Sequence, residues 1–391
     1  MSSSRSPIVK GRLEPSRIEL ARLASGITKA ELARALGVTP RTITNYETGG
    51  APEDLAADLA KVLGCQPDFF WLPPVEPLEH DRVFFRALRR SSASQRHAAT
   101  AAGRLGIELY EWIGRQFVLP GLDLPDFEGA SPEAAAAIVR AAWGLGDRPL
   151  PNLVQLAESR GIRVLGLPVT AEAVDAFSVW SDGTPYVFMC RAKTPERARF
   201  DLAHELGHLL LHSRSGRLDE CVGADVEREA DRFASELLIP ADSLSRCVRL
   251  NPSLDEILTA RSYFGVSAMA LTYRLHAIGH VSDYAYRQHC VRLSAMGFRS
   301  GEPGGMLEHE LSRIFTVVLR RLRTDQKLTT EDIARQLGIA VQDLHALTLG
   351  AALFASSSPQ SVNVATRPKN FYSSTRLRDV SAPDCRTDQE S

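Results

Sequence analysis

The chain has 391 residues, of which 44% are hydrophobic and 24% are charged, and its net charge is −1. This composition is that of a globular protein and excludes the disordered and fibrous classes. The length predicts two or three folded units. No apolar run approaches the roughly 18 residues that span a bilayer, and the N-terminus lacks the apolar stretch of a signal peptide, so we expect a cytoplasmic protein that does not bind a membrane.

The six cysteines form no CxxC pair, which argues against a cysteine zinc cluster and suits free thiols in a reducing compartment. Charge is distributed unevenly. Residues 1–50 contain eight Lys or Arg and four Asp or Glu, and residues 82–96 contain basic side chains and no acid. Such an asymmetry suits a nucleic-acid-binding surface, although a solvated helix face explains it equally well.

Clusters of proline and glycine divide the chain into segments of different character. The middle of the chain alternates helical patterns with three β-like runs at 162–169, 173–180 and 185–190. We therefore expect a multidomain protein with an all-α unit, an α+β unit with a small sheet, and a helical C-terminal region. The expected divisions are 1–75 (all-α), 76–130 (a connector, helical and basic over 80–117), 131–285 (α+β), 286–354 (helical) and 355–391 (disordered).

Residues 27–50 show the pattern of a helix-turn-helix. Ala33 is small enough for a second helix to cross close to it, and Gly37 can adopt the left-handed conformation that the tight turn requires. Thr39 and Pro40 then suit the N-cap and the first position of the second helix. The alternative is a helical hairpin that only packs.

In a helix-turn-helix, the start of the second helix meets base edges in the major groove. The side chains expected there are Arg41, Thr42 and Asn45. Lys29 and Arg17, together with Arg22, are expected to contact phosphates, which add affinity without sequence information.

Residues 32–70 resemble an XRE-family DNA-binding domain nearly throughout. The resemblance implies binding to double-stranded operator DNA as a homodimer. Pro40 and Lys29 stand where many relatives carry glutamine, so the bases that are read do not follow from it. Residues 329–344 repeat the pattern weakly, but Asp343 would repel phosphate at the reading edge, and we expect a structural or dimerising unit there.

The segment 200–212, FDLAHELGHLLLH, has the spacing of a metal site. On a helix, His204 and His208 lie one turn apart on the same face and can bind one ion. Glu205 is placed to act on a metal-bound water, and Gly207 is expected to leave room beside the ion. The alternative is an ordinary buried helix that carries histidines, and His212 is expected to be a core or helix-end histidine.

A catalytic zinc needs a third protein ligand and one open position. Residues 225–240 supply it, because Glu227 and Asp231 share a helix face. We expect Glu227 to bind the metal and Asp231 to accept the outer N–H of a metal-bound histidine. Glu229 is the second choice of ligand and Asp225 the third.

Residues 197–212 and 227–240 resemble the ImmA/IrrE family of zinc metallopeptidases, and the resemblance covers about residues 132–280. It implies a zincin-like fold, Zn2+ held by His204, His208 and Glu227, and Glu205 as the catalytic base. It also implies an endopeptidase that cleaves a repressor-type protein. No oxyanion donor is evident beyond the candidates Tyr186, His212 and Arg232. The alternative is a transcription factor or antitoxin in which this fold is a non-hydrolytic sensor or dimerisation module.

Overall fold

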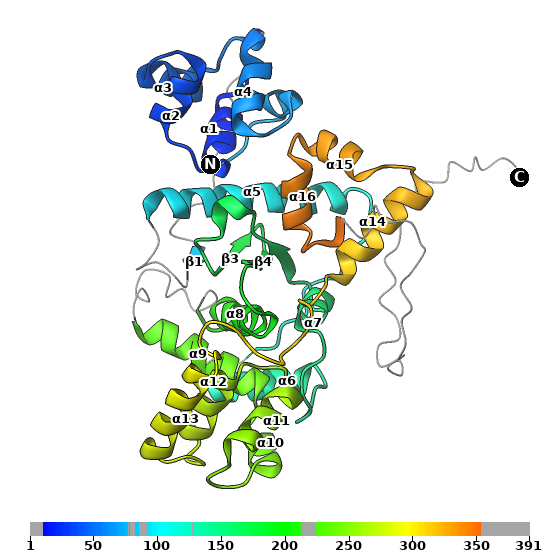
Figure 1. The fold of residues 1–391 in the computed structure, drawn as a ribbon. Coiled ribbons are helices and arrows are strands. Elements are labelled where there is room, and N and C mark those ends of the chain that lie inside the picture. The colour runs from blue at the N-terminus through cyan, green and yellow to red at the C-terminus, as the bar shows by residue number, and fades with distance from the viewer. Residues whose placement is uncertain are drawn as a thin grey trace, which may run out of the picture.

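A computed structural model of the chain describes residues 11–76, 78, 83–85, 92–126, 129–212 and 224–352, with only the backbone of residues 83–85 and Ala224. Figure 1 shows its layers from top to bottom: an N-terminal helical domain, the long helix α5, a small sheet, and a lower group of helices. The expected fold class is confirmed, since an all-α domain precedes an α+β domain and a helical C-terminal region.

The N-terminal domain contains the predicted helix-turn-helix. Leu32 and Ile43 are fully buried between its helices. Gly37 ends α2 with a left-handed φ of 68°, and Thr39 caps α3 by accepting a hydrogen bond from the backbone N–H of Thr42. The elements are α1 (Pro15–Ala24), α2 (Lys29–Leu36), α3 (Pro40–Gly49), η1 (Glu53–Leu55), α4 (Ala56–Leu63) and η2 (Pro67–Trp71).

The sheet has four strands in the order β1-β3-β4-β2, namely β1 (Val83–Phe85), β2 (Arg163–Gly166), β3 (Ala176–Ser181) and β4 (Thr184–Met189). β3 and β4 form an antiparallel hairpin, β2 runs parallel to β4, and β1 pairs antiparallel with β3. The first predicted β-like run contains β2, and the other two contain β3 and β4 except for one residue of each, Ser181 and Thr184. The prediction of a helix over the whole of 80–117 is wrong, because residues 83–85 form a strand and the helix begins at Ala93.

Helix α5 (Ala93–Gly114) covers one face of the sheet and carries the N-terminal domain on its other side. Tyr110 of α5 packs edge-on against Tyr186 of β4, with ring centroids 6.1 Å apart. Helix α1 contacts α5 directly, and one apolar core runs from the N-terminal domain through α5 to Phe177 and Phe188 of the sheet. The N-terminal domain is therefore packed against the helix that covers the sheet.

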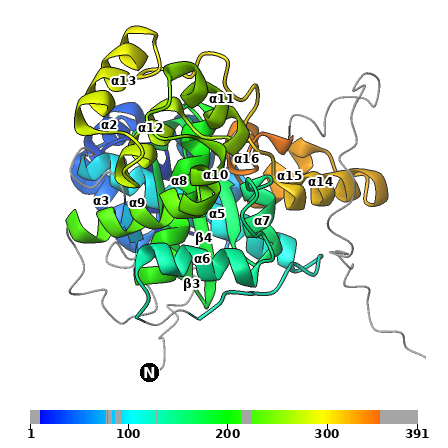
Figure 2. The same ribbon diagram turned by 90° about the horizontal axis from the view of Figure 1, so that it is seen from below.

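The opposite face of the sheet is covered by helix α8. Helix α8 contacts β3 and β4, and α9 packs against both α8 and α6. Figure 2 shows α6 and α8 on this side of the sheet, with α5 beyond it. The elements are α6 (Pro132–Ala142), α7 (Leu153–Ser159), η4 (Val169–Ala171), α8 (Pro195–Gly207), the π-helical turn η5 (His208–His212), α9 (Ala224–Leu238), α10 (Ala241–Cys247), α11 (Leu254–Phe264), α12 (Ala268–Ala277) and α13 (Asp283–Ala295).

The C-terminal region consists of α14 (Arg313–Asp325), α15 (Thr330–Leu337) and α16 (Val341–Leu347). The α15–α16 pair repeats the local form of α2–α3, since Gly338 ends α15 with φ 68°, the value at Gly37. Helix α16 contacts β2 and buries Leu344 and Leu347, so it packs into the body of the protein. This placement agrees with the expected structural unit.

The predicted disordered tail, 355–391, lies outside the described residues, as do residues 86–91 of the basic stretch. Among the described residues, no helix combines the length and the hydropathy of a membrane-spanning segment.

Candidate metal centre and DNA-reading surface

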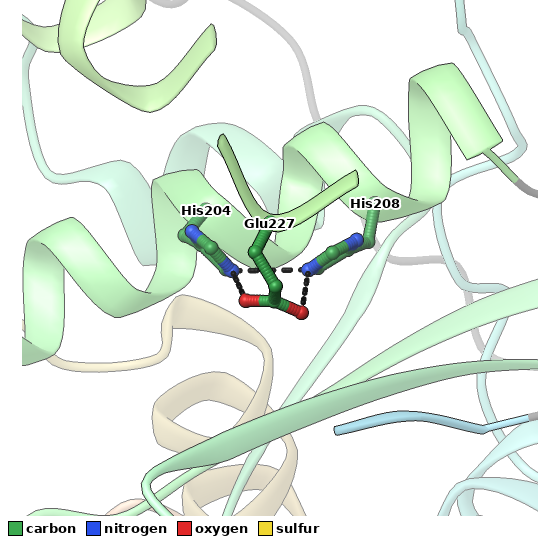
Figure 3. Close-up of side chains that lie close together, drawn as sticks. All are labelled: His204, His208 and Glu227. Carbon is green, nitrogen blue, oxygen red and sulfur yellow. Dashed lines mark hydrogen bonds and ion pairs between the residues drawn. The ribbon is translucent and has the colours of Figure 1, made fainter. Parts of the chain in front are cut away.

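The end of helix α8 brings two histidine rings together. His204 lies in its last turn, and His208 begins the π-helical turn that follows. Their side chains are 0% and 1% exposed, and the two Nε2 atoms lie 3.0 Å apart. Figure 3 shows both rings projecting from the same side of the helix toward one point. The predicted pair of imidazoles therefore converges.

Helix α9 supplies the carboxylate. Glu227 Oε2 lies 3.3 Å from Nε2 of His204, and Oε1 lies 3.5 Å from Nε2 of His208. Figure 3 shows the carboxylate facing both rings. The ligand atoms of all three residues lie within 4.8 Å of one another, and no other such group of His, Cys, Asp or Glu occurs in the described ranges.

These separations fit a tetrahedral metal ion. With bonds of about 2.0–2.1 Å, neighbouring ligand atoms lie about 3.3 Å apart. The two Nε2 atoms lie 3.0 Å apart, and they lie 3.3 and 3.5 Å from the two different oxygens of the Glu227 carboxylate. Burial lowers the pKa of His208 to about 4, which keeps a ring lone pair available. Burial opposes ionisation of Glu227, but its hydrogen bonds with the two histidines prevail and lower its pKa to about 2. Neutral imidazoles and a carboxylate are the forms that bind a metal.

Three other acids of α9 have different partners. Asp231 Oδ1 lies 2.8 Å from Nδ1 of His204, so it accepts the outer N–H of that ring, the position expected for it. Glu229 lies 3.2 Å from Nε2 of His212, and Asp225 is an exposed residue that pairs with Arg228. Of the α9 acids, only Glu227 joins the group of metal-ligating atoms.

Glu205 is fully buried on the sheet side of α8. Its Oε2 accepts a hydrogen bond of 2.7 Å from Oγ of Ser178 on β3, which is also fully buried. Ser178 was not among the predicted site residues. Its signal was a hydroxyl residue inside the otherwise apolar run Ala176–Trp180, at a position that strand alternation turns toward α8 and away from the α5 face.

Three other expectations for this region need correction. Gly207 faces α9 and not the ion, because a Cβ there would lie 3.1 Å from Cα of Ala230. Tyr186 lies on the α5 face of the sheet, against Tyr110, and Arg232 binds Glu133 of α6 at 2.6 and 2.8 Å. These two of the three candidate oxyanion donors therefore do not adjoin the metal centre, whereas the third, His212, contacts His208.

Helix α3 presents its first turns to solvent. Arg41 and Asn45 are exposed, and Thr42 is partly exposed with its hydroxyl 2.9 Å from that of Thr39. Lys29 of α2, expected to contact phosphate, has a side chain that is 40% exposed, and its Nζ lies 2.8 Å from Glu47 of α3. The predicted reading residues therefore share one accessible surface.

Arg17 does not belong to this surface. It is 4% exposed, its Nε donates to the carbonyl of Pro73 at 2.8 Å, and its Nη1 lies 2.8 Å from Glu108 of α5. Arg22 is also buried and binds Glu47 at 2.5 Å. Each of the two buried guanidinium groups pairs with a carboxylate of another helix, so it joins helices inside the protein.

Comparison with known proteins finds a family match for each of two regions of the chain. Residues 18–70 match the helix-turn-helix family model, and residues 157–276 match the model of the IrrE N-terminal-like domain, a metallopeptidase family. The fold and the two matches together define the class of the protein: a regulator with a DNA-binding domain and a protease-like domain. The chain combines an XRE-type helix-turn-helix domain with an ImmA/IrrE-like metallopeptidase-family domain, as both resemblances predicted.

One curated relative is the Metallopeptidase ImmA of Bacillus subtilis (strain 168), to which the chain is 29% identical over 107 residues. The match covers 26% of this chain and 61% of that relative. The chain therefore spans less than two thirds of the length of the relative that it matches.

Proposed function

We propose that this protein is a DNA-binding transcriptional regulator whose second domain is a zinc-dependent endopeptidase. The observation that carries the proposal is the convergence of His204, His208 and Glu227 beside the buried Glu205. A set of two imidazoles and one carboxylate is that of catalytic zinc sites, which keep one position for water or substrate. We further propose a repressor-type protein as the substrate, operator DNA bound by a homodimer, and a cytoplasmic location.

The residues divide the work of peptide hydrolysis. His204, His208 and Glu227 would hold the zinc, which supplies an acidified water and polarises the substrate carbonyl. Asp231 keeps the proton of His204 on Nδ1, so that Nε2 faces the metal. Glu205 accepts the proton of the attacking water and returns it to the leaving amine. Ser178 fixes the direction of the Glu205 carboxylate through the bond at Oε2.

The test uses purified full-length protein, its Glu205→Gln and His204→Ala variants, and the exposed Glu172→Gln as a matched control. We expect one zinc per chain in the parent, in Glu205→Gln and in the control, and little in His204→Ala. Cleavage of a panel of repressor proteins should fall by at least about 100-fold in Glu205→Gln and stay unchanged in the control. Equal cleavage by Glu205→Gln and the parent would contradict the assigned mechanism.

The buried contact between α1 and α5 favours a second candidate. Arg17 and Glu108 join the DNA-reading domain to the helix on the sheet, so the metallopeptidase fold could act as a non-hydrolytic sensor or dimerisation module of a transcription factor or antitoxin. Operator binding that changes with zinc, while zinc-loaded protein leaves every repressor in the panel intact, would favour this candidate over the protease.

A further inference from the structure

His212, the third histidine of the segment, ends the π-helical turn and makes two ring contacts. Its Nδ1 lies 3.0 Å from Nδ1 of His208, and its Nε2 lies 3.2 Å from Oε2 of Glu229 on α9. The ring is buried, with 4% of its surface exposed. His212 therefore lies between a residue of the metal-ligating group and a carboxylate.

The direction of each hydrogen bond follows from the role of His208. If Nε2 of His208 offers its lone pair at the metal centre, the proton of that neutral ring must be on Nδ1. That proton is donated to Nδ1 of His212, which must then be the acceptor. The proton of the His212 ring is consequently on Nε2, from which it is donated to Glu229. One set of tautomers satisfies both contacts.

The same pattern holds at the other histidine in a shorter form. His204 donates from Nδ1 directly to Asp231 at 2.8 Å. The rings of His204 and His208 are thus both linked by hydrogen bonds to a carboxylate of α9, His204 directly and His208 through His212. Outer partners of this kind fix the orientation of a metal-binding ring and raise its basicity.

We propose that His212 and Glu229 form a positioning relay that holds Nε2 of His208 toward the metal. The relay rests on the proposed metal centre. It gives His212 and Glu229 a role that is separate from those of the metal ligands and of the catalytic base. Both residues act through His208 and touch neither metal nor substrate.

The test measures zinc affinity by competition with a chromogenic chelator on the full-length protein. His212→Phe preserves a ring that fills the site but can neither accept nor donate, and we expect zinc affinity to fall about 10- to 100-fold. His212→Asn is smaller, but its side-chain oxygen can accept from Nδ1 of His208, so it should stay within about threefold of the parent. A role in packing alone predicts the opposite order of the two variants.

Glu229→Leu provides a second variant, with Asp225→Asn as the matched control on the same helix. We expect Glu229→Leu to weaken zinc binding about tenfold and Asp225→Asn to leave it unchanged. Co2+ loaded in place of zinc should show altered visible absorption bands in His212→Phe and unaltered bands in Asp225→Asn.

The outcomes separate this inference from the function on which it rests. A parent that binds zinc no better than His204→Ala would overturn the metal centre and the relay together. A parent that binds zinc tightly while His212→Phe and Glu229→Leu bind it equally well would overturn the relay alone. A tighter complex in His212→Phe than in His212→Asn would also overturn it.

Discussion

Gly207 is the residue through which the packing of α8 on α9 reaches the metal centre. In Gly207→Ala, the new Cβ would lie 3.1 Å from Cα and 3.3 Å from the carbonyl oxygen of Ala230. Favourable carbon contacts lie at about 3.5–4.0 Å. The atoms that must yield are those of the Ala230 backbone together with Cδ1 of the Phe233 side chain at 3.2 Å, so α9 has to move by a few tenths of an ångström. Ala230 adjoins Asp231 and lies one turn from Glu227.

Two opposing effects set the size of the change in stability. Replacing a helical glycine by alanine favours the helix by about 1 kcal/mol, whereas overfilling a packed site costs about 1–3 kcal/mol. We expect the free energy of unfolding of Gly207→Ala to fall by about 1 kcal/mol as the difference of the two. Zinc affinity should fall about tenfold, equivalent to about 1.4 kcal/mol, because Glu227 moves with α9.

Gly114→Ala is the matched control, because Gly114 ends α5 and a Cβ there meets no atom within 4 Å. Urea denaturation should show this variant to be as stable as the parent or up to about 1 kcal/mol more stable. Chelator competition should show unchanged zinc affinity in it. If Gly207→Ala gains stability as the control does and keeps its zinc affinity, the close contact between α8 and α9 does not govern the metal centre.

Three further predictions concern the rest of the chain. Burial raises the pKa of Glu158 to about 7, so the folded protein keeps a proton that the unfolded chain loses near pH 4.5. The free energy of unfolding should therefore fall by up to about 3 kcal/mol as the pH rises from 4.5 to 7. Urea denaturation of Glu158→Gln at several pH values should lack this dependence. Glu47→Ala leaves the buried Arg22 without its carboxylate; unfolding should become easier by about 3 kcal/mol, and the double variant Arg22→Met/Glu47→Leu should recover most of the loss. Arg41→Ala should weaken operator binding by about 1–3 kcal/mol if it reads a base, whereas equal losses on all DNA sequences in a binding assay would make it a phosphate contact.

Local rules in the sequence were sufficient where the structure depends on neighbours within a turn or two. The turn at Gly37 and the cap at Thr39 were predicted because each depends only on residues close to it in the sequence. The four-residue spacing of His204 and His208 fixed a common face in the same way. The assignment of Glu227 needed one further assumption, that α9 packs on α8, and the geometry supports it.

The features that were missed all depend on distant partners. Strand β1 forms because β3, about 95 residues further along the chain, offers an edge to pair with. Arg17 is buried because Glu108 lies on a helix that covers the domain. The contact of Ser178 with Glu205 requires the sheet and α8 to be stacked in one particular register. Neither periodicity nor charge counting reports such long-range pairings.

The attachment of the N-terminal domain limits how the protein can meet DNA. Arg17 binds Glu108 on α5, and the backbone N–H of Gln66 donates to the carbonyl of Gly338 beyond α15, at 2.9 Å. With anchors at two separate places, α3 cannot swing on a loose tether to search for a target. In any pair of chains, the distance between the two reading helices would be dictated by the surfaces that join the bodies, and with it the number of base pairs that can separate the two halves of an operator.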